Sequence, residues 1–292
     1  MLLMHHHASP SWLVPIPLTL LTLAIAILYL RGWHQLVRDF SSTIPLWRAA
    51  CFLTGLALIW LALGSPLASL DHQFLTAHMI QHLLLMTVAP ALILLGDPVR
   101  LLVHGLPQQF VEGILDPALR WPPLQQLGKF LTNPILCWLI ATATLITWHV
   151  PAIFGIAIQS AALHLIEHST FVLAGFLFWW PVIQPWPSVS IWPRWPILLY
   201  LFLATIPCDI LSAYLTFCDT VVYTSYLRLP QASELSVLRD QELAGSLMWT
   251  CVTILYLVPA AILTVRLLER PSKELHSPVA ALKLSRIGSD WF

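Results

Sequence analysis

Five histidines lie within apolar stretches of the chain, where ionisable side chains are uncommon. His78 and His82 stand in HMIQHLLLM, His149 in TWHVP, and His164 and His168 in HLIEHSTF. An imidazole in hydrocarbon is costly unless it is paired, hydrated or bound to a ligand. Two pairs repeat the spacing H-x-x-x-H, which on a helix places both rings on one face, about 6 Å apart between Cβ atoms. This spacing predicts a metal site.

The side chains near these histidines favour copper. Imidazole suits copper, zinc and iron, whereas a thioether favours Cu(I). Met79 adjoins the first pair, Met86 follows His82 by one helical turn, and Met248 lies in the last apolar stretch. We expect Cu(I) rather than Mg²⁺ or Ca²⁺, because the carboxylates that those ions prefer are scarce here. Asp240 is expected to orient a ligand ring, since bound histidines commonly donate their second N–H to a carboxylate.

The composition is that of an integral membrane protein. Of 292 residues, 58% are hydrophobic and 10% are charged, against about 25% charged in soluble domains. The mean hydropathy is +0.78. The 14 basic and 14 acidic residues give a net charge of zero, so nothing indicates binding to nucleic acid. Membrane lipid is the expected surrounding.

Seven apolar stretches are candidates to cross a bilayer, which takes about 20 residues per helix. The sequence therefore predicts an all-α, polytopic protein. A seven-helix membrane domain over residues 1–265 would be followed by a basic tail over residues 266–292. No basic cluster or cleavage site precedes the first stretch, so we expect it to be a retained helix. The predicted helices cover residues 12–30, 46–64, 74–95, 135–149, 161–182, 196–217 and 243–265.

The distribution of basic residues predicts the orientation. The loops after the first, third and fifth stretches, together with the tail, hold 12 of the 14 Lys and Arg residues. Because basic loops stay in the cytoplasm, the N-terminus is predicted outside and the C-terminus in the cytoplasm. All five histidines then fall in the outer third of the bilayer, at depths that match within a turn or two. The sequence thus predicts that the five rings form one cluster.

Several segments of the chain also resemble a known family. In order, they are HMIQHLLLMTVAPALILLGDPVRLL, WHVPAIFGIAIQSAALHLIEHSTFVLAGFLFWWPVI, LTFCDTVVYTSY and DQELAGSLMW. Over residues 67–265 the chain looks like the polytopic CtaG family of cytochrome c oxidase assembly factors. This resemblance implies a protein of the bacterial cytoplasmic membrane that helps a haem-copper oxidase to mature by delivering copper. It also implies that the family's site residues correspond to the five histidines, Asp240 and Gln241.

Copper delivery requires no catalysis, so we expect no enzyme activity. The expected partners are an oxidase subunit in the same membrane and a periplasmic copper donor. Two alternatives remain open. The histidines could serve as axial ligands of b-type haem, or the chain could be a transporter or an intramembrane enzyme. His164, Glu167 and His168 match the protease pattern H-x-x-E-H, but the sequence indicates no third ligand or substrate gate.

Overall fold

The computed structural model describes residues 15–40, 44–185, 195–228 and 235–275. These residues form helices and connecting turns, and no strand occurs among them, which confirms the all-α prediction. Residues 12–14 of the first predicted helix and residues 276–292 of the predicted tail lie outside the described ranges.

The described residues contain six spans long and apolar enough to cross a membrane, or seven if one bent pair counts as a span. The bent pair is α9 (Pro122–Leu131) and α10 (Pro134–His149), which meet at 63°. The short fourth stretch, 135–149, lies within α10, so the bend precedes it. The other spans are α1 (Ile16–Phe40), α2 (Leu46–Gly64), Leu75–Leu95, α12 (Ala161–Ile183), α13 (Pro196–Phe217) and α14 (Val237–Leu275).

Two helices run further than the apolar stretches predict. The first continues from residue 30 to Phe40, and α14 begins at Val237 and continues past residue 265 to Leu275. Hydropathy marks the part of a helix that suits hydrocarbon, whereas a helix ends only where capping or breaking residues interrupt its hydrogen bonds. The first ten residues of the predicted tail are therefore helical.

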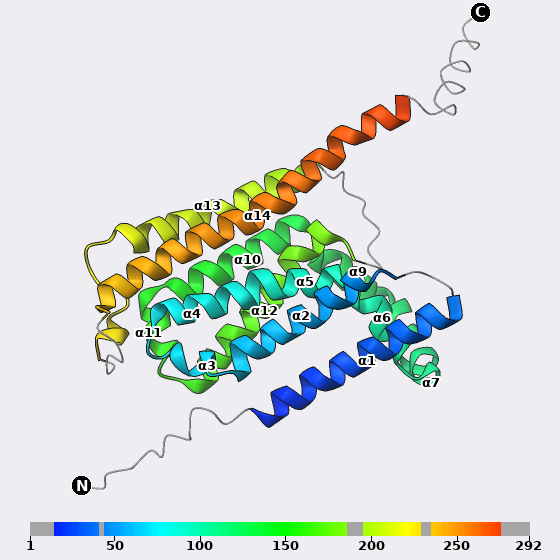
Figure 1. Cartoon of the computed structure of the whole chain (residues 1–292), viewed down its shortest axis with the longest axis horizontal. Helices are drawn as coiled ribbons and strands as arrows, with labels where there is room; N and C mark the ends of the chain where they lie inside the picture. The colour runs from blue at the N-terminus through cyan, green and yellow to red at the C-terminus, as the bar shows by residue number, and fades with distance from the viewer. Residues whose placement is uncertain (1–14, 41–43, 186–194, 229–234, 276–292) are drawn as a thin grey trace, which may run out of the picture.

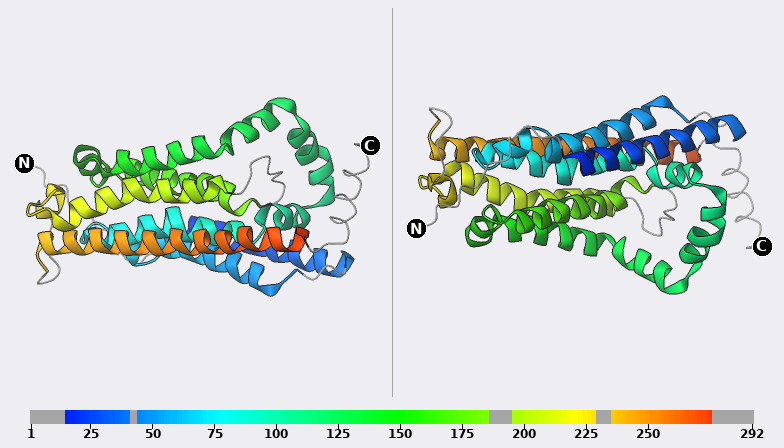
Figure 2. Two further views of the ribbon diagram at one scale, coloured as in Figure 1. Left: turned by 90° about the horizontal axis from the view of Figure 1, so that it is seen from above. Right: turned by 90° about the horizontal axis from the view of Figure 1, so that it is seen from below.

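Short helices gather at the two ends of the bundle (Figures 1 and 2). At the end where α4 begins lie α3 (Leu67–Leu70), α11 (Pro151–Ala157) and the 3-10 turn η3 (Thr224–Arg228). The opposite end holds α6 (Pro98–Gly105), α7 (Gln108–Phe110), η2 (Val111–Leu115) and α8 (Asp116–Arg120), which lead into α9.

The span Leu75–Leu95 is the centre of the bundle. Its most apolar window is 67% buried, against 11–33% for the windows of the other five spans. It consists of α4 (Leu75–His82), the π-helical turn η1 (Leu83–Val88) and α5 (Ala89–Leu95). These segments contact α2, α12 and α14, and α13 and α14 lie side by side along the bundle (Figure 1). The side chains of this span therefore face other helices.

The π-helical turn directly follows His82 and has a local cause. Pro90 has no N–H to donate to the carbonyl of Met86, and the ladder there widens, with Ala89 N–H donating to the Leu84 carbonyl. Gly175 on α12 makes room for this turn, because a Cβ at that position would lie 2.4 Å from the Met86 carbonyl oxygen. The close contact of α12 with the central span thus depends on a glycine.

Gly175→Ala is expected to lower the free energy of unfolding by roughly 1–3 kcal/mol, the usual cost of adding a methyl group to a tightly packed interior. Thermal unfolding of the purified protein in detergent measures the effect. Gly128→Ala in α9 is the matched control, since nothing lies within 4 Å of its added Cβ. Equal unfolding temperatures for Gly175→Ala and the unmodified chain would contradict this reading of the contact.

Candidate metal centre

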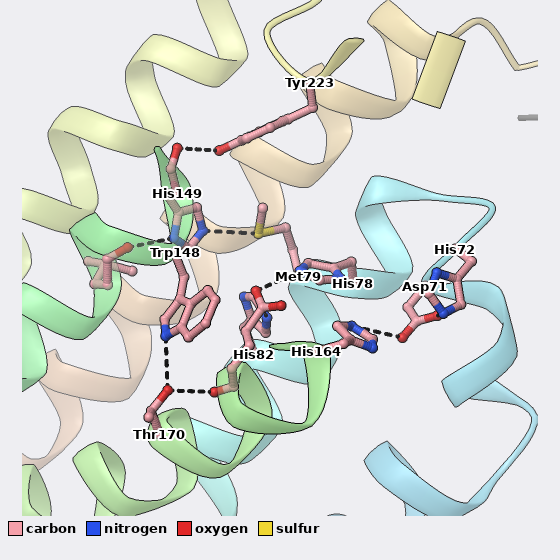
Figure 3. A network of polar contacts seen from close by, with 12 residues as sticks. Asp71, His72, His78, Met79, His82, Trp148, His149, His164, Thr170 and Tyr223 are labelled. Carbon is pink, nitrogen blue, oxygen red and sulfur yellow. Dashed lines mark hydrogen bonds and ion pairs between the residues drawn. The ribbon is translucent and has the colours of Figure 1, made fainter. Parts of the chain in front are cut away.

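The five predicted histidines come together where α4 begins, α10 ends and α12 begins, and Figure 3 shows four of them, His78, His82, His149 and His164. His78 and His82 have ring centroids 4.2 Å apart, as do His164 and His168. Between helices, the centroids of His78 and His164 are 5.6 Å apart, and those of His82 are 5.8 Å from His149 and 5.9 Å from His168. The sequence therefore predicted correctly that these rings form a cluster.

A carboxylate joins the first histidine pair. Oε1 of Glu167 lies 3.3 Å from Nε2 of His78 and 3.2 Å from Nε2 of His82. Donors that bind one tetrahedral ion at about 2.0–2.3 Å lie roughly 3.3–3.7 Å from one another, so these distances are close to those of a chelate. We call His78, His82 and Glu167 the inner site.

The inner site is sealed from solvent. His78 and Glu167 have no exposed surface, and His82 is 6% exposed. The ring nitrogens of both histidines and both carboxylate oxygens of Glu167 make no hydrogen bond within the described chain. A buried polar group without a partner costs about 1–3 kcal/mol, and more when it is charged. These atoms thus have the chemistry and the unmet bonding capacity of metal ligands.

Helix geometry explains why α12 contributes three side chains to the whole cluster of histidines and carboxylates. Ser160 caps its start by accepting a hydrogen bond from Leu163 N–H. From there, His164, Glu167 and His168 follow at spacings of three and four residues, which place them on one helix face. Thr170 donates a hydrogen bond to the carbonyl of Glu167 and accepts one from Trp148 on α10 (Figure 3). This bond fixes α12 against α10 beside the inner site.

The ring of His149 is oriented by a contact with the backbone of its own helix. Its Nδ1 lies 2.7 Å from the carbonyl of Leu145, and because a carbonyl only accepts, Nδ1 carries the proton and Nε2 keeps its lone pair. That Nε2 lies 3.4 Å from the sulfur of Met79 (Figure 3). Tyr223 donates a hydrogen bond to the carbonyl of His149. An imidazole and a thioether are therefore placed side by side next to His82.

The other two predicted methionines lie deeper. Met86 and Met248 line an apolar cavity of about 40 Å³, together with His82, His149 and Met79. Met248 is 4% exposed and belongs to the main hydrophobic core, against which Met86 packs. The cavity adds soft sulfur donors next to the imidazole cluster.

Asp240 occupies a different place from the one predicted. Its carboxylate accepts hydrogen bonds from the backbone N–H groups of Leu75 and Thr76, at 2.6 and 3.2 Å, and from the Thr76 hydroxyl. The N-cap residue of α4 is Phe74, which offers no side-chain acceptor, so Asp240 supplies one from α14. Its hydrogen bonds thus position α4, and this corrects the expectation that Asp240 orients a ligand ring.

Sequence reasoning missed two acidic side chains that lie close to the histidine rings. Glu167 contacts His78 and His82, and Asp71 lies 3.5 Å from Nε2 of His164. Both carboxylates are buried. The expectation that carboxylates are scarce around the histidines is therefore wrong. An acidic residue inside a predicted span was the available signal for Glu167.

The comparisons with known proteins agree with this architecture. The family model described as cytochrome c oxidase caa3 assembly factor, CtaG, matches residues 27–270. The chain belongs to this family. The match includes every described residue that we place in the metal centre, so these side chains lie within the CtaG region.

Three curated relatives are uncharacterized mycobacterial proteins. Those of Mycobacterium bovis and Mycobacterium tuberculosis are each 28% identical over 235 residues, covering 77% of this chain and 34% of the relative. The Mycobacterium leprae protein is 22% identical over 260 residues, covering 87% of this chain and 38% of the relative. The chain thus spans little more than a third of the length of these relatives. No solved structure matches it.

Asp240→Ala should loosen the start of α4. Loss of a helix cap costs about 0.5–2 kcal/mol, and we expect faster amide hydrogen exchange at Leu75 and Thr76. Glu242→Ala is the control, because the Glu242 carboxylate accepts a hydrogen bond from the exposed side chain of Arg239, and exposed pairs contribute about 0–1 kcal/mol. Unchanged exchange at Leu75 and Thr76 in Asp240→Ala would remove the capping role.

Proposed function

We propose that this chain binds copper at the inner site and delivers it to a cytochrome c oxidase during assembly. The observation that supports the proposal is the position of Glu167. One of its carboxylate oxygens, Oε1, lies within 3.3 Å of Nε2 of both His78 and His82. Three buried donors at these distances, with no other hydrogen-bond partner in the described chain, form a site for one ion.

The surrounding donors fit copper. Imidazole binds both oxidation states of copper, and the thioether of Met79 adds a ligand that favours Cu(I). Mg²⁺ and Ca²⁺ prefer shells made of oxygen ligands, whereas nitrogen and sulfur predominate here. The ring centroids of His149, His164 and His168 each lie 5.6–5.9 Å from the ring of His78 or His82. This surplus of ligands allows copper to leave by exchange of one ligand at a time, and no catalytic step is needed.

The proposed setting follows from the predicted orientation. The metal centre lies at one end of the bundle, and the distribution of basic residues predicts that this end faces outward. A periplasmic donor would then supply copper, and the oxidase subunit would receive it within the same bacterial cytoplasmic membrane. Buried copper sites of oxidase subunits in the membrane are reached most directly by a carrier that spans the same bilayer.

The geometry favours an ion over b-type haem. Axial ligands must approach haem iron from opposite faces of the macrocycle. His78 and His82 instead project from one helix toward the same oxygen of Glu167, and a porphyrin plane between α4 and α12 would have to displace this carboxylate. An absorption spectrum of the purified protein without a Soret band is the expected result.

His82→Ala and Glu167→Gln are expected to lower copper affinity by at least about tenfold, the effect typical of disturbing a metal site. Each protein is loaded with one equivalent of copper per chain, and the copper that it retains is measured by mass spectrometry. Oxidase activity is measured in membranes. His34→Ala is the control, since His34 is exposed on α1. Copper content and oxidase activity equal to those of the unmodified chain in both variants would refute the proposal.

The orientation can be tested with Cys218, which follows α13 at the same end of the bundle as the metal centre. Hydrogen bonding to Thr220 lowers the pKa of this thiol, which favours the reactive thiolate. A membrane-impermeant maleimide should label intact spheroplasts expressing the chain, and Cys218→Ser should abolish the labelling. Labelling only after the membrane is opened would place the metal centre on the cytoplasmic side.

A further inference from the structure

A second group of metal ligands lies beside the inner site and has its own carboxylate. Asp71, in the turn after α3, has Oδ1 3.7 Å from Nε2 of His72 and Oδ2 3.5 Å from Nε2 of His164. One donor atom from each of the three residues lies within 4.8 Å of the other two. We call Asp71, His72 and His164 the mouth site.

The mouth site is built around a buried and unsatisfied carboxylate. Asp71 is 1% exposed, and neither of its side-chain oxygens makes a hydrogen bond within the described chain; the same holds for Nε2 of His164. Placing a carboxylate out of contact with water is costly unless a cation or a donor satisfies it. This unmet bonding capacity points to a bound cation.

The turn that carries Asp71 is held in place from a distant part of the chain. Tyr226 in η3 donates a hydrogen bond of 2.7 Å to the backbone carbonyl of Asp71. Because the backbone of Asp71 is fixed in this way, its carboxylate stays directed toward His72 and His164 (Figure 3).

Exposure differs sharply between the two sites. The side chain of His72 is 49% exposed and that of His164 is 12% exposed, whereas the side chains of the inner site are at most 7% exposed. The rings of His164 and His78 are nearly parallel, with centroids 5.6 Å apart. An ion bound to His164 at the mouth site would therefore lie next to His78 of the inner site.

We infer that the chain has two metal sites in series, with the mouth site taking a divalent transition-metal ion from solvent and passing it to the inner site. Each site has one carboxylate and two imidazoles, so each ion would meet one compensating negative charge, and repulsion between two neighbouring ions would be reduced. His168 lies near both sites, with its ring centroid 4.2 Å from that of His164 and 5.9 Å from that of His82, and its Nε2 makes no hydrogen bond in the described chain. This inference rests on the proposed function for the ion at the inner site and for the direction of transfer.

The test is metal stoichiometry of the full chain in detergent, dialysed separately against Zn²⁺ alone and Cu²⁺ alone and analysed by mass spectrometry. We expect two ions per chain for the unmodified protein, one for Asp71→Asn, one for Glu167→Gln and none for the double variant. Asp116→Asn is the matched control, because Asp116 is a half-exposed carboxylate that pairs with Arg120 on α8, and it should keep two ions.

His72→Ala is a second test of the mouth site, in case Asp71→Asn does not fold. Because the side chain of His72 is half exposed, its removal should leave the fold intact. In His72→Ala, the dissociation constant of the ion at the mouth site should rise at least about tenfold, the change expected from a damaged metal site. One ion in the unmodified chain that Asp71→Asn keeps and Glu167→Gln loses would overturn the mouth site and leave the inner site standing. One ion that Asp71→Asn loses and Glu167→Gln keeps would overturn the series and the proposed inner site.

Discussion

The contact of one buried carboxylate with two imidazoles constrains the rest of the structure. Glu167 on α12 meets His78 and His82 on α4 inside a span that is mostly buried by other helices. Without an ion, this group is expensive, because its oxygens find only ring nitrogens and no hydrogen-bond donor of good geometry. Its position therefore depends on close packing of α12 against the central span. Gly175 and the π-helical turn at Leu83–Val88 make that close packing possible.

Polar groups near the cluster fall into two kinds with different consequences. Asp240, Tyr223 and Tyr226 all have hydrogen-bond partners, and each contacts backbone atoms: the N–H groups of α4, the carbonyl of His149 and the carbonyl of Asp71. They form a frame that fixes where the ligand-bearing segments lie. The side chains inside the frame have ring nitrogens and carboxylate oxygens without hydrogen bonds in the described chain. Such a division is expected of a preorganised site, because rigid support holds groups that are satisfied only when the ligand is present.

The sequence predicts the imidazole cluster well because its signals are local. Spacing of four residues places His78 with His82 and His164 with His168, and span counting puts both pairs and His149 at one depth. Glu167 was within reach of the same logic, since it lies on the helix face of His164 and matches the pattern H-x-x-E-H. Asp71 was not: it stands in a turn, and the hydrogen bond that fixes it joins residues 155 positions apart. The cap from Asp240 to Leu75 is equally long-range. Contacts of this kind depend on how helices pack, which periodicity and hydropathy do not encode.

The order of the donors along the bundle bears on the direction of transfer in the proposed function. At the mouth, a carboxylate and two imidazoles suit a divalent ion that arrives hydrated. The inner site, next to His164, has the same kinds of ligand, one carboxylate and two imidazoles, and is buried. Beyond His82, the imidazole of His149 meets the thioether of Met79, beside a cavity lined by Met86 and Met248. The donors thus become softer and the surroundings less polar with depth. A copper ion gains nitrogen and sulfur donors as it moves inward, with no change of oxidation state required, so the series of sites itself supplies a direction.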